Sequence, residues 1–260
     1  MACKQVLRWC AVAGACAWLT VVGAQFSFGG TITIDSFDLP DKGTVFVLSP
    51  SGGPQWDHTH AVGDGSILGN DRDVSILLSG APSLDAIVAV GVIGVDLNVT
   101  DGNGMFTFGS QANSGSTVRL TYDGSGNAGL GSLDLTDGGI NTDFALRFAG
   151  SEGVMPEGLD VTIAAKSSLG GTLSYSGYIP DHSDPLAPLV HRIPFADFTV
   201  AGGGASFETV DTLTFVFNGD QTPNVDFSLD MVAAVPEPSS VALLGLCLAV
   251  FAGRVLRRRR

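Results

Sequence analysis

Residues 210–217 read Val-Asp-Thr-Leu-Thr-Phe-Val-Phe, and residues 225–231 read Val-Asp-Phe-Ser-Leu-Asp-Met. Apolar and polar side chains alternate in both stretches, which is the period of a β-strand with one face against a core. In the second stretch the alternation predicts that Val225, Phe227, Leu229 and Met231 share the buried face.

The same alternation recurs upstream, and turn-forming residues separate the runs. Alternating runs lie at residues 31–37, 117–122, 144–148 and 161–163, with clusters of Gly, Asp and Asn at 101–104, 123–127, 137–139, 202–204 and 218–220. Lys, Glu and Arg are scarce between the two ends of the chain, so good helix formers are missing there. Many short strands between turns predict an all-β protein with a single antiparallel β-sandwich over residues 25–234.

Residues 193–198 read Ile-Pro-Phe-Ala-Asp-Phe and precede these two strands. Together the three stretches resemble the last part of galactose-binding-like jelly rolls, as in carbohydrate-binding modules. The resemblance implies a jelly-roll-like sandwich in which the first and last strands come together. It also implies carbohydrate binding as one candidate function.

The C-terminal segment, residues 235–260, has three parts in order. Pro236 and Pro238 flank Glu237 and predict an extended, exposed hinge over Val235–Ser240. Val241–Ala252 contains no charged side chain and is followed by Arg254 and four terminal arginines, Arg257, Arg258, Arg259 and Arg260. A helix of about 12 to 15 residues reaches roughly 20 Å, less than the ~30 Å hydrocarbon core, so we expect a short, weak transmembrane helix with cytoplasmic arginines.

The Pro-Glu-Pro tripeptide, the apolar run and the arginine cluster together resemble the PEP-CTERM sorting signal of bacterial exported proteins. The resemblance implies recognition by an exosortase, a membrane cysteine protease-transpeptidase that removes the tail after export, as happens to other discarded hydrophobic sorting signals. It implies an inner-membrane-anchored intermediate and then a cell-surface or extracellular protein. A permanent tail anchor and a buried core helix are the alternatives.

The N-terminal segment, residues 1–24, predicts a secretory signal peptide. Lys4 and Arg8 precede the apolar run Trp9–Val22, and small residues lead to a cleavage site between Ala24 and Gln25. A lipoprotein signal ending at Cys16 is the alternative. Both ends of the chain therefore indicate export through the secretion machinery.

The predicted ectodomain has no cysteine and a strong negative charge. All four cysteines lie in the two terminal segments, which excludes disulfides, cysteine-ligated zinc and a thiol nucleophile from the ectodomain. Seven of the 13 basic residues but only one of the 26 acidic residues lie in those segments, so the ectodomain carries six basic and 25 acidic residues and a net charge of −19. Such a surface repels nucleic acid and attracts divalent cations.

Several aspartates fall on the first and last predicted strands. Asp35, Asp38 and Asp230 are candidate oxygen ligands for a structural calcium ion, because the two strands are expected to lie side by side. The alternative is a solvated acidic surface. No other cofactor is expected.

Residues 69–74 read Gly-Asn-Asp-Arg-Asp-Val and resemble a Gly-Gly-x-Arg-Asp stretch of ectodomains that carry the same sorting signal. Arg72, between Asp71 and Asp73, is a candidate for a buried ion pair, with an exposed turn as the alternative.

Two further groups of side chains are candidate ligand sites. His58 and His60 would share a strand face, as two metal ligands require, unless they lie in a solvated loop. Trp56, Tyr122, Tyr175 and Tyr178 are the polar-tipped aromatic residues that could stack on sugar rings, unless they pack in the core.

Catalytic motifs are missing from the sequence. It has no Gly-x-Ser-x-Gly elbow, no His-Glu-x-x-His and no phosphate-binding loop. We therefore expect a non-enzymatic, exosortase-sorted protein with a structural or adhesive role in exopolysaccharide or biofilm. A carbohydrate-binding module is the alternative, and a glycan hydrolase is the third hypothesis.

Overall fold

A computed structural model describes residues 30–37, 46–47, 55–59, 67–79, 88–93, 105–110, 115–148, 158–180, 188–218 and 226–237. The chain divides into two units, residues 1–30 and 31–260. All described strands belong to the second unit. The predicted signal peptide, residues 1–24, and the predicted transmembrane helix Val241–Ala252 lie outside the described residues.

The strands form two seven-stranded sheets in which every pairing is antiparallel. The first, called the β14 sheet here, has the order β11 (Leu189–Pro194), β8 (Asn141–Phe148), β14 (Asp226–Pro236), β6 (Met105–Ser110), β5 (Val88–Ile93) and β2 (Phe46–Val47). β1 (Ile32–Asp35) also pairs with β14, so the first and last strands are neighbours, as expected.

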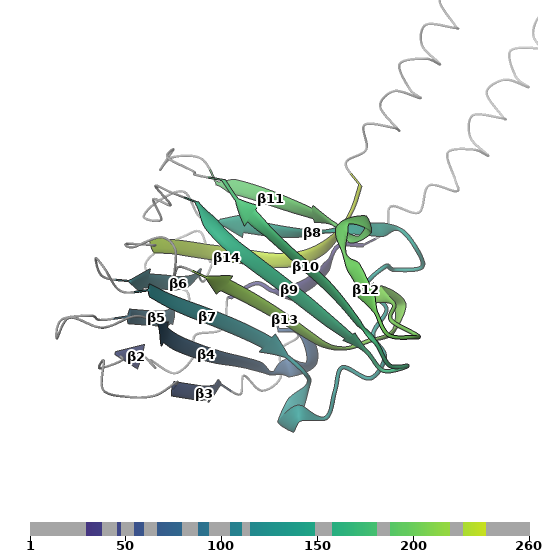
Figure 1. Cartoon of the computed structure of the whole chain (residues 1–260), viewed down its shortest axis with the longest axis horizontal. Coiled ribbons are helices and arrows are strands. Elements are labelled where there is room, and N and C mark those ends of the chain that lie inside the picture. The colour runs from purple at the N-terminus through teal and green to yellow at the C-terminus, as the bar shows by residue number, and fades with distance from the viewer. Residues whose placement is uncertain are drawn as a thin grey trace, which may run out of the picture. The chain divides into compact units, whose positions relative to one another are not determined.

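The second, called the β13 sheet here, has the order β12 (Thr199–Ala201), β10 (Thr172–Ile179), β9 (Leu159–Ser167), β13 (Val210–Asn218), β7 (Gly115–Tyr122), β4 (Arg72–Ser79) and β3 (Gln55–Thr59). The two sheets overlie one another (Figure 1), and one core cluster contains buried side chains from both. The predicted antiparallel β-sandwich is confirmed for the described residues.

β9 shows why these sequences form strands of a sandwich. Its side chains alternate between buried and more exposed positions along the whole strand, with Val161 and Ile163 inside and Asp160 and Thr162 outside. β13 follows the same rule, with Leu213, Phe215 and Phe217 completely buried. Each strand therefore buries one apolar face, and two such faces packed together exclude water from the core.

One predicted face is wrong, because β14 contains a bulge. Phe227 and Leu229 face the core as predicted, but the register with β8 shifts between Leu229 and Met231. An extra residue in one strand inverts the alternation beyond it. Val232 therefore enters the core, and Met231 packs against a small cluster of Ala145, Ala233 and Val235 on the other side of the sheet. Val225 lies outside the described residues.

The Ile-Pro-Phe-Ala-Asp-Phe stretch is the corner where the chain passes from one sheet to the other. It connects β11 in the β14 sheet to β12 in the β13 sheet through the short 3-10 helix η3 (Phe195–Asp197). Phe195 stacks on Phe207 of η4 (Phe207–Thr209) with ring centroids 4.1 Å apart, and Phe198 meets the same ring edge-on at 5.0 Å. These rings pack against Phe144 of β8 and close the core beside the crossing.

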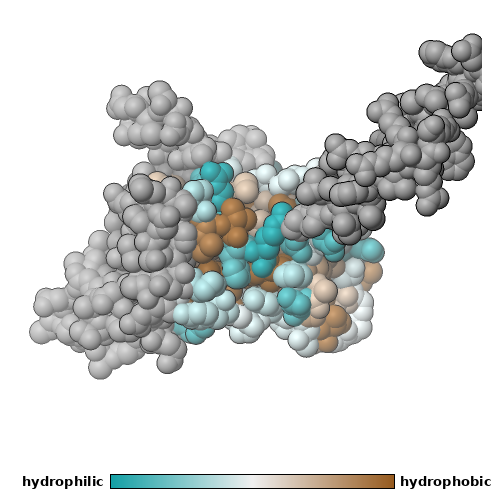
Figure 2. All heavy atoms as spheres, turned by 90° about the horizontal axis from the view of Figure 1, so that it is seen from above, coloured by the Kyte–Doolittle hydropathy of each residue, from teal (hydrophilic) through white to brown (hydrophobic). Residues whose placement is uncertain are grey.

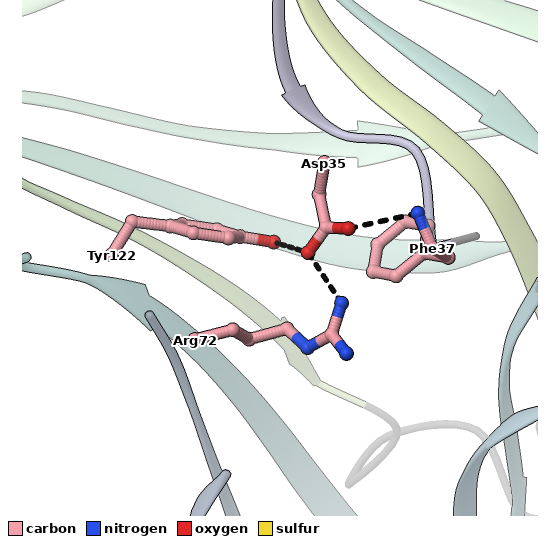
Figure 3. A network of polar contacts seen from close by, with 4 residues as sticks. All are labelled: Asp35, Phe37, Arg72 and Tyr122. Atoms are coloured by element: carbon pink, nitrogen blue, oxygen red, sulfur yellow. Dashed lines mark hydrogen bonds and ion pairs between the residues drawn. The ribbon is translucent and has the colours of Figure 1, made fainter. Parts of the chain in front are cut away.

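A buried polar network joins the two sheets inside the core (Figure 3). The carboxylate of Asp35, on β1, accepts a hydrogen bond from Nη1 of Arg72 on β4 at 2.6 Å and from the hydroxyl of Tyr122 on β7 at 2.9 Å. Asp35, Arg72 and Tyr122 are all completely buried. Arg72 is thus the predicted buried ion-pair residue, and it pairs with Asp35, which is distant in the sequence.

Phe37, two residues after Asp35, completes the network. Its backbone amide donates to the other oxygen of Asp35 at 2.8 Å, and its ring lies 5.2 Å from the guanidinium carbon of Arg72. Phe37 has a φ of 54°, which is unfavourable for a bulky residue, so the hydrogen bond and the burial of the ring must offset that cost. Burial raises the pKa of the Asp35 carboxyl, while Arg72, Tyr122 and the Phe37 amide oppose the rise.

Asp134 organises the turn between β7 and β8. Its Oδ1 accepts hydrogen bonds from the backbone amide and the hydroxyl of Thr136 at 2.8 and 2.6 Å, and its Oδ2 accepts one from the Gly138 amide at 2.9 Å. Burial opposes ionisation of Asp134, but these hydrogen bonds outweigh it and hold the pKa below its ordinary value.

Replacing Arg72 with Met should destabilise the sandwich by about 3 to 5 kcal/mol, because it leaves the Asp35 carboxyl buried without its cation. The carboxyl should then take up a proton, and a raised folded-state pKa means that stability is lost as pH rises above the unfolded value of 3.8. Urea unfolding should therefore show that Arg72→Met loses less unfolding free energy, relative to wild type, at pH 3.5 than at pH 7. As a control, Lys166→Met on an exposed position of β9 should change stability by less than about 0.5 kcal/mol. An equal loss in both variants would contradict this role for Arg72.

Replacing Asp134 with Ala should lower the free energy of unfolding by about 1 kcal/mol, because three hydrogen bonds in the turn are lost. The native pKa is depressed, so this contribution is present above pH 3.8 and disappears as pH falls through the lower folded-state value. Asp134→Asn keeps the oxygen that Thr136 uses and should lose less. Urea unfolding from pH 7 to pH 2.5 measures both effects. A loss of unfolding free energy in Asp134→Ala that does not depend on pH would contradict a stabilising role for the ionised carboxylate.

Candidate functional site

The sorting tripeptide begins inside the last core strand. β14 continues through Pro236, which pairs with Asn141 of β8, and Glu237 is the first exposed residue after it. Val235 is only 7% exposed, so the predicted exposed hinge starts after the strand rather than at Val235. Pro238 and the remainder of the tail, with Val241, Ala252 and Arg257 to Arg260, lie outside the described residues.

Arg192, on β11, connects the end of β14 to the sheet. Its Nη1 donates to the backbone carbonyl of Pro236 at 2.8 Å and to Oδ2 of Asp143 on β8 at 2.8 Å. The Asp143 side chain is 8% exposed and the Arg192 side chain is 36% exposed. A partly buried carboxylate therefore orients a cation that binds the first residue of the tripeptide. Neither residue carries a sequence signal for this role, because nothing local in the sequence indicates that they meet.

The face of the β13 sheet that points away from the core is largely polar. Its cross-strand rows run Arg119–Val216–Thr162–Ser176, Thr121–Thr214–Ala164–Ser174 and Asn218–Asp160–Tyr178. We call these eleven residues the outer face of the β13 sheet. Hydroxyl, carboxylate and guanidinium groups thus lie in rows beside one aromatic side chain, Tyr178, which is 52% exposed.

The candidate stacking aromatics have different environments. Tyr122 is buried in the ion-pair network, and Tyr175 packs against Phe198 with ring centroids 5.5 Å apart. Tyr178 is exposed and lies on β10 beside Asp160 of β9. Trp56 lies on β3 opposite Ser75, and its side chain is not among those described. Of the three tyrosines, Tyr178 is exposed, Tyr175 is partly buried and Tyr122 is completely buried.

The predicted calcium ligands do not form one described cluster. Asp35 is engaged by Arg72, and Oδ2 of Asp230 lies 2.9 Å from Nε of Arg147. Asp38 lies outside the described residues. Across the described segments, no group of three or more His, Cys, Asp or Glu residues is arranged to hold a metal ion. His58 is placed on β3 without a described side chain and His60 is outside the description, so the calcium site and the histidine pair stay predictions.

Three aspartates gather at the loop around η2 (Ser125–Asn127). Burial raises the pKa of Asp123, and the neighbouring carboxylates of Asp73 and Asp71 raise it further. Asp71 is buried and accepts a hydrogen bond from the Gly126 amide at 3.1 Å. Asp71 therefore fixes the loop to the start of β4.

Patches of apolar surface remain between the polar ones. Among the residues whose side chains are described, the exposed large apolar ones are Leu169, Tyr178, Val190 and Val200. Figure 2 shows one face of the molecule, on which apolar patches are separated by hydrophilic side chains. In the described part of the chain, no helix has the length and apolar character needed to cross a membrane.

The comparisons with known proteins agree with this description. Residues 234–260 match the family model of the PEP-CTERM protein-sorting motif. A search of curated protein sequences finds no match to the chain.

The sandwich is similar to several carbohydrate-binding structures from Clostridium thermocellum. A family 30 carbohydrate-binding module of a cellulosomal cellulase is 14% identical, with a TM-score of 0.40, over 80% of this chain and 99% of that one. A family 11 carbohydrate-binding module in complex with a β-1,3-1,4-mixed-linked tetrasaccharide is 13% identical, with a TM-score of 0.35, over 73% and 94%. The N-terminal modules of an endo-1,4-β-D-xylanase with xylohexaose are 10% identical, with a TM-score of 0.26, over 81% of this chain and 29% of that one.

These likenesses concern the fold alone, which the strand pairings of the two sheets establish. The C-terminal match is of a different kind, because it covers the tripeptide, the apolar run and the arginines in order. The chain carries a PEP-CTERM sorting motif directly after an all-β sandwich, which marks it as an exported protein processed by an exosortase.

Proposed function

We propose that this protein is a structural and adhesive component of the exopolysaccharide or biofilm at the cell surface. The observation that carries the proposal is the direct succession of a folded, cysteine-free sandwich and a sorting motif, with Pro236 still in β14 and Glu237 exposed. Such a domain needs no disulfide to be stable outside the cell, since two seven-stranded sheets bury a continuous core.

We further propose that the protein is not an enzyme. Burial raises the pKa of the Asp35 carboxyl, but this side chain is completely buried and bonded to Arg72, Tyr122 and the Phe37 amide. A general acid must reach its substrate, so Asp35 is unsuited to catalysis. The exposed acidic side chains instead give the surface its negative charge and favour hydration and cation-dependent association with a matrix.

Specific carbohydrate binding is the second candidate function, and the outer face of the β13 sheet favours it. An exposed aromatic ring can stack on a sugar ring, and nearby hydroxyl and charged groups can hydrogen-bond its hydroxyls. Tyr178 supplies the ring, and Asp160, Ser176 and Thr162 supply polar groups on neighbouring positions.

The sorting proposal predicts that protein recovered from its native host lacks the C-terminal apolar run and arginines. Deleting the exosortase should leave the full tail in place, and replacing the four terminal arginines with Ser should impair retention and processing. Intact-mass analysis of both fractions measures the tail directly. An unprocessed tail in the wild-type host would contradict the proposal.

A glycan array and host exopolysaccharide separate the two candidate functions. A matrix component should bind exopolysaccharide without a saturable oligosaccharide ligand, and Tyr178→Ala should leave this binding unchanged. A specific module should instead bind one glycan class saturably, and Tyr178→Ala should weaken that binding about tenfold, with Leu169→Ala as the exposed apolar control. Release of reducing sugar from the same glycans would refute the non-enzymatic assignment.

A further inference from the structure

The end of β14 places a constraint on how the sorting tail can be removed. Pro236 is paired with Asn141, and the preceding Val235 is buried against Ala145 and Ala233. β14 is also an interior strand, with β8 on one edge and β6 and β1 on the other. The residues just before the tripeptide therefore have their backbone groups committed to neighbouring strands.

A protease needs a substrate segment whose backbone is free of hydrogen bonds to its own fold. Cleavage within a folded domain requires local opening, because the substrate backbone has to leave its own hydrogen bonds to enter the active site. Proline cannot donate a backbone hydrogen bond, so the pairing of β14 weakens at Pro236 and other contacts must hold that residue. Arg192 supplies such a contact through the hydrogen bond from its Nη1 to the Pro236 carbonyl.

We propose that Arg192, oriented by Asp143, is a positioning residue for tail processing. It holds Pro236 to the sheet, so that the folded sandwich presents the tripeptide with Glu237 as the first accessible residue, and cleavage falls on the C-terminal side of Pro236. Asp143 lies opposite Val235 in the register, so it lies beside the end of β14. Arg192 therefore determines how far the boundary of the folded domain extends toward the cleaving enzyme.

The charges around this contact explain how a single arginine can hold the end of β14. The Arg192 nitrogen lies 2.8 Å from both a carboxylate oxygen and a carbonyl oxygen, so the ion pair fixes the donor and the donor fixes the strand end. Arg147 lies on the same side of the β14 sheet and also pairs with an aspartate, but its partner is Asp230 and not a residue of the tripeptide. Arg147 is therefore a matched control for loss of an arginine–aspartate pair.

The first test is limited digestion of full-length protein, purified in detergent from a host without exosortase, with a non-specific protease. The wild-type core should end at or after Pro236. Arg192→Met should open the end of β14, so that the core ends within residues 232–235 and this segment is cut roughly tenfold faster. Arg147→Met should behave like wild type, and Arg192→Lys should restore most of the protection. Thermal unfolding of each variant separates opening of the strand end from global destabilisation.

The second test is the C-terminal mass of the processed protein from the native host. This inference rests on the proposed processing. The two tests distinguish a failure of the processing proposal from a failure of the role of Arg192. An intact tail in the wild-type host would refute processing, while the digestion boundary would still test the Arg192 contact. A mature wild-type C-terminus upstream of Pro236, or an identical digestion boundary and rate in Arg192→Met and wild type, would overturn the role of Arg192.

Discussion

The ion pair between Asp35 and Arg72 is the constraint on which the sandwich depends. It joins β1 of one sheet to β4 of the other in the middle of an apolar core, and both side chains are completely buried. Burying two charges costs several kcal/mol, and their attraction offsets that cost only with good geometry and further hydrogen bonds. Tyr122 and the Phe37 amide supply such bonds, so the two sheets fit together in the one arrangement that brings all four groups together.

Cations are scarce between the terminal segments, and three arginines there pair with strand aspartates. Arg72 pairs with Asp35, Arg147 with Asp230, and Arg192 with Asp143. The first pair joins the sheets, and the other two lie on the β14 sheet near its last strand. A chain with a large excess of acid can thus expose a negative surface for its environment outside the cell while keeping its cations for internal contacts.

Sequence alternation is sufficient to predict the sandwich, because β7, β8, β9, β13 and β14 each carry their own apolar face. It failed at Met231, since a bulge is set by the neighbouring strand and leaves no local signal. Arg72 was recognised as a candidate ion-pair residue, but its partner lies 37 residues away and could be found only by folding the chain. The contact between Arg192 and Pro236 spans 44 residues and was missed for the same reason, whereas the sorting motif is contiguous and was identified directly.

The buried ion pair joins β4 to β1, the strand that pairs with β14, and the sorting motif lies at the end of β14. A thermodynamic double-mutant cycle on Asp35 and Arg72, using Asp35→Leu, Arg72→Met and the double variant in urea unfolding at pH 7, tests this most directly. The account predicts a coupling free energy of about 3 kcal/mol, with the double variant more stable than Arg72→Met alone. Additive losses, with a coupling below about 0.5 kcal/mol, would contradict it.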